Sequence, residues 1–211
     1  MNEYNREQFE TLCMVHEHVE ALTAVDKGVL LNRLADYLSF RDAVDSFLRE
    51  YFSEICTRNC YQSRLSACCS REGIVTFFAD VAINVLLSSP EEIVNLMNAL
   101  QKPNSGFKCI YLGARGCLWR VKPIVCEMFL CDRARQTVFD GHSDLEERWE
   151  ALTQRKKMFT WPDRPVLFDE LEKYFIDMGC TSPLMYMHNS PGLIRVKRNS
   201  PDYFLKKAQT R

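Results

Sequence analysis

The sequence lacks several features that mark common classes of protein. Its longest apolar segment free of charge and proline, residues 81–89, has about half of the roughly 20 residues that a membrane helix needs. Neither sign of charge is in excess, with 27 basic and 28 acidic side chains. No basic stretch followed by an apolar run stands at the N-terminus, so we expect no secretory signal. We therefore expect a cytoplasmic protein that does not span a membrane and does not bind nucleic acid.

Motifs of common enzymes are also missing. The chain has no Gly-x-Gly-x-x-Gly, no Walker loop and no Gly-x-Ser-x-Gly, so nucleotide-binding and hydrolase templates find no support. It has no Cys-x-x-Cys of the thioredoxin type, which weakens a disulfide-exchange function. Whether the protein is an enzyme therefore stays open.

Cysteine, by contrast, is abundant, with 10 residues in a chain of 211. A chain of this length can bury roughly 70% of its unfolded surface, so it does not need disulfides to fold. In a reducing cytoplasm, clustered cysteines are more often metal ligands or redox groups than structural bridges.

Eight of the cysteines fall within residues 56–131, a segment that is richer in basic than in acidic side chains. Four thiolates suit zinc or the iron of an iron–sulfur cluster, with the 4Fe-4S type favoured if the metal is iron. Eight cysteines could form two such sites, or one site with spare thiols. In an extended backbone the adjacent residues Cys68 and Cys69 point to opposite sides, so both rarely reach one ion without a turn. The candidate metal ligands are Cys56, Cys60, Cys68, Cys69, Cys109, Cys117, Cys126 and Cys131.

Apolar periodicity predicts helices on both sides of this segment. The widest apolar face runs from Val44 to Ile55, so we expect a helix that ends near Cys56 and delivers the first ligand. Residues 74–87 are apolar but fit helix or strand equally well. Ser89-Pro90-Glu91-Glu92 predicts a capped helix over residues 90–101. Further stripes predict helices in residues 9–19, 30–38, 143–156 and 165–178.

Glycines between apolar residues in segment 107–120 predict a short β-hairpin that carries Cys109 and Cys117. Beyond residue 190 the chain turns polar and basic without an apolar face. The predicted fold is thus mainly α, a helical body around a cysteine-rich loop and a short β-hairpin that bind metal. Residues 1–190 would form one domain, with its cysteine centre at 56–131, and residues 191–211 a flexible basic tail.

The order of the cysteine motifs resembles the YkgJ-like family of zinc- or iron-chelating domains. The likeness covers residues 56–131 and rests on the early Cys-x3-Cys and Cys-Cys groups followed by Lys108-Cys109-Ile110-Tyr111, Gly116-Cys117-Leu118-Trp119 and Lys122-Pro123-Ile124-Val125-Cys126-Glu127-Met128-Phe129. Seven residues separate Cys60 from Cys68 here, more than is usual in that family. The resemblance implies a bacterial or archaeal metal-binding protein whose role is otherwise unassigned. It also implies an alternative, an iron–sulfur enzyme related to the flagellin lysine N-methylases.

Other interpretations of the same residues remain. The clustered thiols could be buried and inert, or could serve thiol redox chemistry. Cys13 lies on an apolar helical stripe and Cys180 beside a glycine, so we expect both to lie outside the site. The four histidines, His16, His18, His142 and His188, are likewise not expected to bind metal. An unidentified protein partner could use the apolar residues 185–187.

Overall fold

The computed structural model describes residues 1–66, 68–70, 75–103, 106–160 and 166–185. Its helices confirm the mainly α fold class. They are α1 (Glu3–Ala21), α2 (Ala24–Arg33), α3 (Ala35–Phe52), the π-helix η1 (Ser53–Gln62), α4 (Phe78–Leu87), α5 (Pro90–Gln101), α6 (Ile124–Glu127), α7 (Asp132–Phe139), α8 (Ser143–Thr160) and α9 (Leu167–Asp177). The two short strands β1 (Leu112–Gly113) and β2 (Gly116–Cys117) pair antiparallel.

Local capping explains where several helices begin. The side chain of Asn2 accepts a hydrogen bond from the Asn5 N–H at 2.7 Å, at the start of α1. At α5 the Ser89 side chain accepts from the Glu92 N–H, while the Glu92 carboxylate accepts from the Ser89 N–H. This reciprocal pair satisfies two N–H groups that the first turn of a helix leaves without a partner. The capped helix predicted over residues 90–101 is confirmed.

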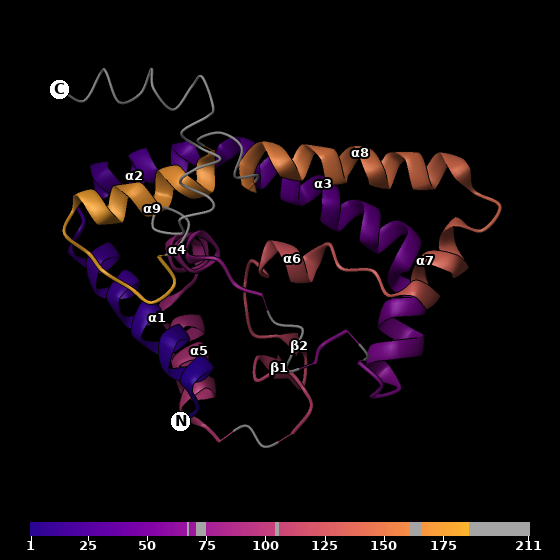
Figure 1. The fold of residues 1–211 in the computed structure, drawn as a ribbon, viewed down its shortest axis with the longest axis horizontal. Helices are drawn as coiled ribbons and strands as arrows, with labels where there is room; N and C mark the ends of the chain where they lie inside the picture. Colours follow the sequence, from indigo (N-terminus) through magenta and orange to yellow (C-terminus); the bar gives the residue numbers. More distant parts are fainter. Residues whose placement is uncertain (67, 71–74, 104–105, 161–165, 186–211) are drawn as a thin grey trace.

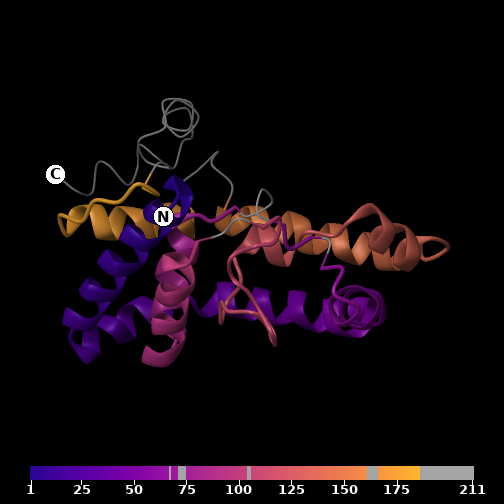
Figure 2. The ribbon, with the colours of Figure 1, turned by 90° about the horizontal axis from the view of Figure 1, so that it is seen from below.

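The helices form two arms with the hairpin and α6 between them (Figures 1 and 2). One arm contains α1 and α5, and the other contains the end of α3, η1 and α7. Helix α8 packs along α3, and α9 packs against α4 near the top of the view in Figure 1. Strand β2 and helix α6, which carry Cys117 and Cys126, therefore lie between the two arms, whereas η1, which carries Cys56 and Cys60, belongs to one of them.

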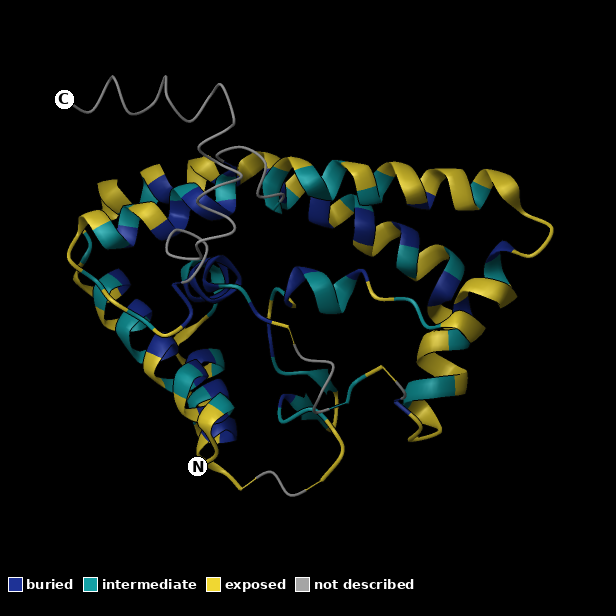
Figure 3. Ribbon diagram, in the orientation of Figure 1, coloured by how far each residue is buried: buried dark blue, intermediate teal, exposed yellow. Residues whose placement is uncertain are grey.

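Two hydrophobic clusters hold this arrangement together. The first contains Tyr37, Phe40 and Phe52 of α3 with Trp149 of α8. The second joins α1, α4 and α5 to the hairpin region and includes the buried Tyr111. Helix α4 contributes to both clusters, and Figure 3 shows it as the most continuously buried helix. The sequence did not decide whether segment 74–87 forms a helix or a strand. The structure shows a helix from Phe78, and its apolar residues pack into both hydrophobic clusters.

Two expectations need correction. Helix α3 does not stop at Cys56, because the chain continues beyond Phe52 as the π-helix η1 to Gln62. Cys56 and Cys60 therefore lie within a helical segment. The hairpin is also shorter than expected, and Cys109 precedes its first strand. The expected basic tail, residues 191–211, lies outside the described residues, as do Tyr186, Met187 and His188. Met185 is described and is buried in the second cluster.

Within the described part of the chain, no helix combines the length and apolar character needed to cross a membrane.

Candidate metal centre

The first two cysteines lie on the π-helical segment η1. Cys56 is exposed and Cys60 is half-buried. They are four residues apart, so they lie close to one face of the helix. π-helical turns are rare and occur frequently at functional sites. Burial, followed by the nearby thiols of Cys68, Cys131 and Cys60, raises the pKa of Cys56 to about 11.

The adjacent cysteines follow a tight turn. The N–H of Cys69 donates to the carbonyl of Ser66 at 3.1 Å, and Ser66 has a positive φ of 39°. The two thiols interact with each other through a side-chain hydrogen bond. That bond lowers the pKa of Cys69 and raises the pKa of Cys68. In an extended backbone the two side chains would point to opposite sides. The turn at Ser66 lets the thiols of Cys68 and Cys69 face each other instead.

A backbone contact joins this turn to the distant hairpin region. The N–H of Cys109 donates to the carbonyl of Cys69 at 2.9 Å, and Ser70 and Lys108 form an antiparallel bridge. The Lys108 ammonium also donates to the carbonyls of Leu65 and Ser66. Segments 65–70 and 108–109 are thus held side by side despite the 39 residues between Cys69 and Cys109 in the sequence.

Backbone N–H groups act on the sulfurs on the hairpin side. Those of Tyr111 and Leu112 act on Cys109, and that of Trp119 acts on Cys117. These donors lower the thiol pKa values, but burial is the larger effect and raises that of Cys109 to about 11. Burial likewise raises the pKa of Cys117. N–H groups aimed at sulfur stabilise its negative form, as is needed around a metal thiolate.

The last two cysteines flank a short helix. Cys126 lies within α6 and accepts a hydrogen bond from the N–H of Val75. Burial is the main reason why its pKa is raised. Cys131 is the N-cap residue of α7, a helix that packs against η1. Cys131 is thereby brought near Cys56, which the sequence places 75 positions earlier.

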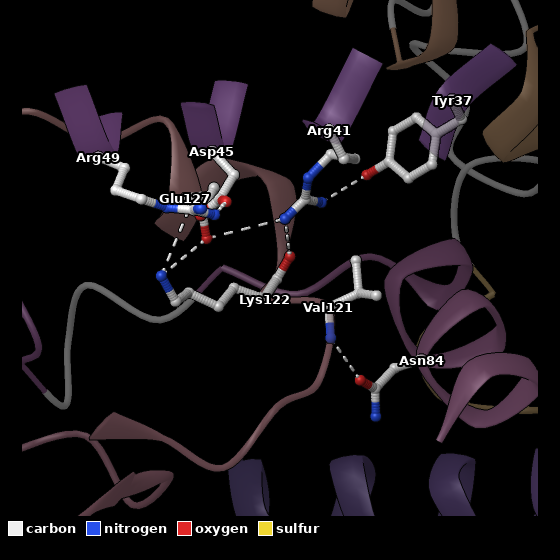
Figure 4. Close-up of polar contacts among 8 residues, drawn as sticks. All are labelled: Tyr37, Arg41, Asp45, Arg49, Asn84, Val121, Lys122 and Glu127. Atoms are coloured by element: carbon white, nitrogen blue, oxygen red, sulfur yellow. Dashed lines mark hydrogen bonds and ion pairs between the residues drawn. The ribbon is translucent and has the colours of Figure 1, made fainter. Parts of the chain in front are cut away.

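A buried polar network fixes the chain between Cys117 and Cys126 (Figure 4). Arg41, on α3, donates to the Tyr37 hydroxyl at 2.8 Å and to the Lys122 carbonyl at 2.7 Å. Its guanidinium also lies 3.8 Å from the Glu127 carboxylate. Figure 4 shows Glu127 between Arg41 and the Lys122 ammonium, which is 3.0 Å from the same carboxylate. Helix α3 thus anchors both ends of segment 122–127.

Helix α4 anchors the same segment from the other side. Asn84 accepts a hydrogen bond from the Val121 N–H at 3.0 Å, and Asp80 accepts one from the Ile124 N–H at 3.1 Å. Asp80 also accepts from the Phe77 N–H at 3.0 Å, and so caps its own helix as well. Burial raises the pKa of Asp80 to about 6, although the two N–H donors and Arg41 oppose that change.

Lys122 is a basic side chain that acts directly on the thiols. Its ammonium lowers the pKa of Cys68 and of Cys117. Burial lowers the pKa of Lys122 itself, but Glu127 and Cys117 outweigh burial and raise it. Arg58 and Arg120, which also lie between the cysteines in the sequence, pair with Glu54 and Glu92. Lys122 pairs with Glu127 as well, but it also favours the negative form of two of the thiols.

The structure gathers the thiols without closing a coordination shell. Among the described residues, no three cysteine, histidine, aspartate or glutamate side chains are grouped closely enough to hold a metal ion. Thiol sulfur is a donor that suits a soft metal, and the Lys122 ammonium favours the thiolate form of Cys68 and Cys117, whereas burial opposes it. Closing a shell would require side-chain rotation and loss of the thiol protons.

Cys13 and Cys180 have different neighbours from the eight candidate ligands. Burial and the nearby Glu17 raise the pKa of Cys13. The sulfur of Cys180 is 3.7 Å from His18, whose ring packs against Tyr174 and Phe175. His18 therefore takes part in helix packing between α1 and α9.

Sequence reasoning missed the anchoring residues. Asp80 and Asn84 are four residues apart in an otherwise apolar helix, and both are buried. Arg41 interrupts the apolar face of α3 in the same way. A polar residue inside a continuous apolar face is the signal that would have found them, because a buried polar group needs a hydrogen-bond partner.

Comparisons of the chain with protein-family models, with curated proteins and with solved structures give no significant match.

Proposed function

We propose that the protein binds zinc or an iron–sulfur cluster through its clustered cysteine thiolates. One observation carries this proposal: the backbone joins two cysteine-bearing segments that are distant in sequence, with Cys109 donating to Cys69 at 2.9 Å. The thiol of Cys69 then lies within electrostatic range of Cys109, Cys117 and Cys126. Inert core cysteines would not require a backbone link between two distant cysteine-bearing segments.

The role of the bound group would be structural. It would link residues 56–69 to residues 109–131 and supply folding free energy, for which structural zinc sites contribute roughly 10 kcal/mol or more. The chain's own contribution is to fix the donors. Arg41, Asp80 and Asn84 hold segment 121–127, while the turn at Ser66 sets the adjacent cysteines.

The test is elemental analysis of the full-length protein purified without oxygen. Iron with sulfide, or zinc, in stoichiometric amount is the expected result, and the Cys13→Ser variant should contain as much metal as the wild type. An iron–sulfur cluster would give brown protein, and zinc would give colourless protein. Absence of both metals from wild-type protein, with a fold that chelators leave unchanged, would overturn the proposal.

A second candidate is a thiol redox protein, favoured by the contact between Cys68 and Cys69. The hydrogen bond from Cys68 lowers the pKa of Cys69, which makes its sulfur the more nucleophilic of the pair. This function predicts metal-free protein in which iodoacetamide reacts first with Cys69. Protection of Cys69 by bound metal in the wild type would favour the metal site instead.

A further inference from the structure

Two of the clustered cysteines lie directly opposite each other on paired backbone segments. Ser70 and Lys108 form an antiparallel bridge. One step further along this pairing, Cys69 lies opposite Cys109. The N–H of Cys109 donates to the carbonyl of Cys69 at 2.9 Å, which is one of the two bonds that such a pair can exchange. Residues in opposite positions project their side chains to the same face of a pairing, so both thiols lie on one side of it.

Side chains on either side of the two cysteines hold this register. The Lys108 ammonium donates to the carbonyls of Leu65 and Ser66. The Tyr61 hydroxyl, near the end of η1, donates to the carbonyl of Gly113 on β1 at 3.1 Å. The approach of the two segments therefore depends on several contacts and not on the one backbone bond alone.

The spacing of such a pair suits a disulfide. Opposite residues that share a backbone hydrogen bond have Cα atoms about 5.5 Å apart, within the range of about 4.4–6.8 Å that disulfides span. Their Cβ atoms need to approach each other by about 1 Å. Cys68 is less suited to pair with Cys69, because consecutive Cα atoms are about 3.8 Å apart, below that range.

Backbone pairing does not favour the neighbouring Cys117 in the same way. Cys117, on β2, lies opposite Leu112 of β1. Cys69 and Cys109 are both free thiols and both are half-buried, so a small oxidant can reach them. Opposite position and partial exposure together distinguish this pair.

We propose that Cys69 and Cys109 form a reversible disulfide when the protein reacts with a peroxide. The thiolate of one cysteine attacks hydrogen peroxide, the O–O bond breaks, and a sulfenic acid forms as hydroxide leaves. The second thiol then attacks this sulfur, the S–S bond forms, and the sulfenic oxygen leaves as water. The two thiols lose two electrons and two protons in all, and the peroxide is reduced to two molecules of water.

This oxidation goes beyond the proposed metal binding and does not require it. Both cysteines are among the eight candidate ligands, however, so the disulfide uses thiols that the proposed metal site also needs. Oxidation of the pair and metal binding would therefore oppose each other. For this reason a chelator belongs in the experiment that tests the disulfide.

Peptide mapping of the full-length protein tests the proposal. Reduced protein is treated with stoichiometric hydrogen peroxide in the presence of EDTA, its remaining thiols are blocked with N-ethylmaleimide, and it is digested with trypsin. Cleavage after lysine and arginine places Cys68 and Cys69 in peptide 65–71, and places Cys109, without another cysteine, in peptide 109–115. The expected main product is a link between these two peptides that dithiothreitol removes.

Serine variants assign the link to its two cysteines. Cys69→Ser and Cys109→Ser should lose it. Cys68→Ser should keep it, and so should the matched control Cys117→Ser. A link that persists in Cys69→Ser and disappears in Cys68→Ser would overturn the assignment to the opposite pair.

Unfolded protein is the control for the role of the fold. In concentrated urea the same oxidation should lose its preference and spread over other pairs of cysteines. The proposal is wrong if folded wild-type protein forms no link between peptides 65–71 and 109–115, or joins Cys68 to Cys69 within peptide 65–71 as its main product. Either result would leave the proposed function standing, because elemental analysis tests metal binding separately.

Discussion

Asp80 of α4 caps the short helix α6 by accepting a hydrogen bond from the Ile124 N–H at 3.1 Å. Its other carboxylate oxygen accepts from the Phe77 N–H at 3.0 Å. One buried side chain thus fixes both the start of its own helix and the start of the helix that carries Cys126. The position of that cysteine depends on a residue 46 places earlier in the sequence.

Asp80 should make the stability of the protein depend on pH. Its pKa is about 6 in the folded chain, above the ordinary 3.8, so the folded state holds the proton more tightly than the unfolded state does. The contribution of protonated Asp80 to the free energy of unfolding is therefore fully present below about pH 4 and is lost as the pH rises through about 6. A shift of this size corresponds to on the order of 3 kcal/mol.

The measurement is urea unfolding of wild type and Asp80→Asn at several pH values between 4 and 7. The difference in unfolding free energy between the two proteins should change across that range, with the wild type losing relative stability as the pH rises. At neutral pH the asparagine leaves one N–H without an acceptor, which costs about 1–3 kcal/mol. A difference that is constant with pH would contradict the shifted pKa.

Replacing Arg41 should destabilise the fold strongly. The Arg41→Met variant removes the donor to the Lys122 carbonyl and leaves Lys122 as the ion-pair partner of the buried Glu127 carboxylate in the described part of the chain. Breaking a buried ion pair by removing one partner costs about 3–5 kcal/mol, and Lys122 should keep the loss near the lower end.

Arg6→Met is the matched control, because Arg6 forms an exposed i,i+4 pair with Glu10. Exposed pairs of this kind contribute about 0.3–0.5 kcal/mol. Chemical denaturation under reducing conditions should separate the two variants clearly. Equal losses for Arg6→Met and Arg41→Met would show that the buried network does not contribute to stability.

Local patterns predicted several helices, such as α5 and α9, but not α6 or α7, and long-range packing decided the rest. The bounds of α5 follow from the Ser89 and Glu92 capping box, which lies entirely within the segment it starts. Segment 74–87 gave no such answer, because α4 is buried on both sides and its apolar residues show no clear period. The π-helical continuation beyond Phe52 had no local signal either.

The cysteine positions show the same limit. Clustering in the sequence identified eight candidate ligands, but their grouping depends on contacts between distant segments. The bond from Cys109 to Cys69 and the packing of α7 on η1 are both of this kind. The turn at Ser66 brings the thiols of Cys68 and Cys69 together. It depends on the positive φ of Ser66, which the local sequence does not predict.

The hairpin turn should be sensitive to glycine replacement at one position. Gly116 has a φ of +116°, a conformation that L side chains rarely adopt, and it immediately precedes Cys117. Gly116→Ala should therefore cost about 1–3 kcal/mol, even though no atom lies within 4 Å of the added carbon. Zinc content should fall together with stability, because the strand that carries Cys117 is displaced.

Gly28→Ala provides the opposite control. Gly28 lies inside α2, and the added methyl group would likewise meet no atom within 4 Å. Alanine is favoured over glycine in a helix by roughly 0.5–1 kcal/mol, so this variant should be more stable than the wild type. If both replacements changed the melting temperature in the same direction, the strained turn at Gly116 would not be the cause.

The proposed metal binding should be linked to folding, because the cysteines proposed as ligands belong to segments that are distant in the unfolded chain. A ligand that binds only the folded state at a free concentration a thousand times its dissociation constant stabilises that state by about 4 kcal/mol. Adding Zn²⁺ to the reduced, metal-free protein should therefore raise its melting temperature, and a strong chelator should reverse the rise. Cys180→Ser should respond like the wild type, since Cys180 contacts His18 and is not one of the eight clustered cysteines. Cys109→Ser should respond less, and an undiminished response in this variant would exclude Cys109 as a ligand.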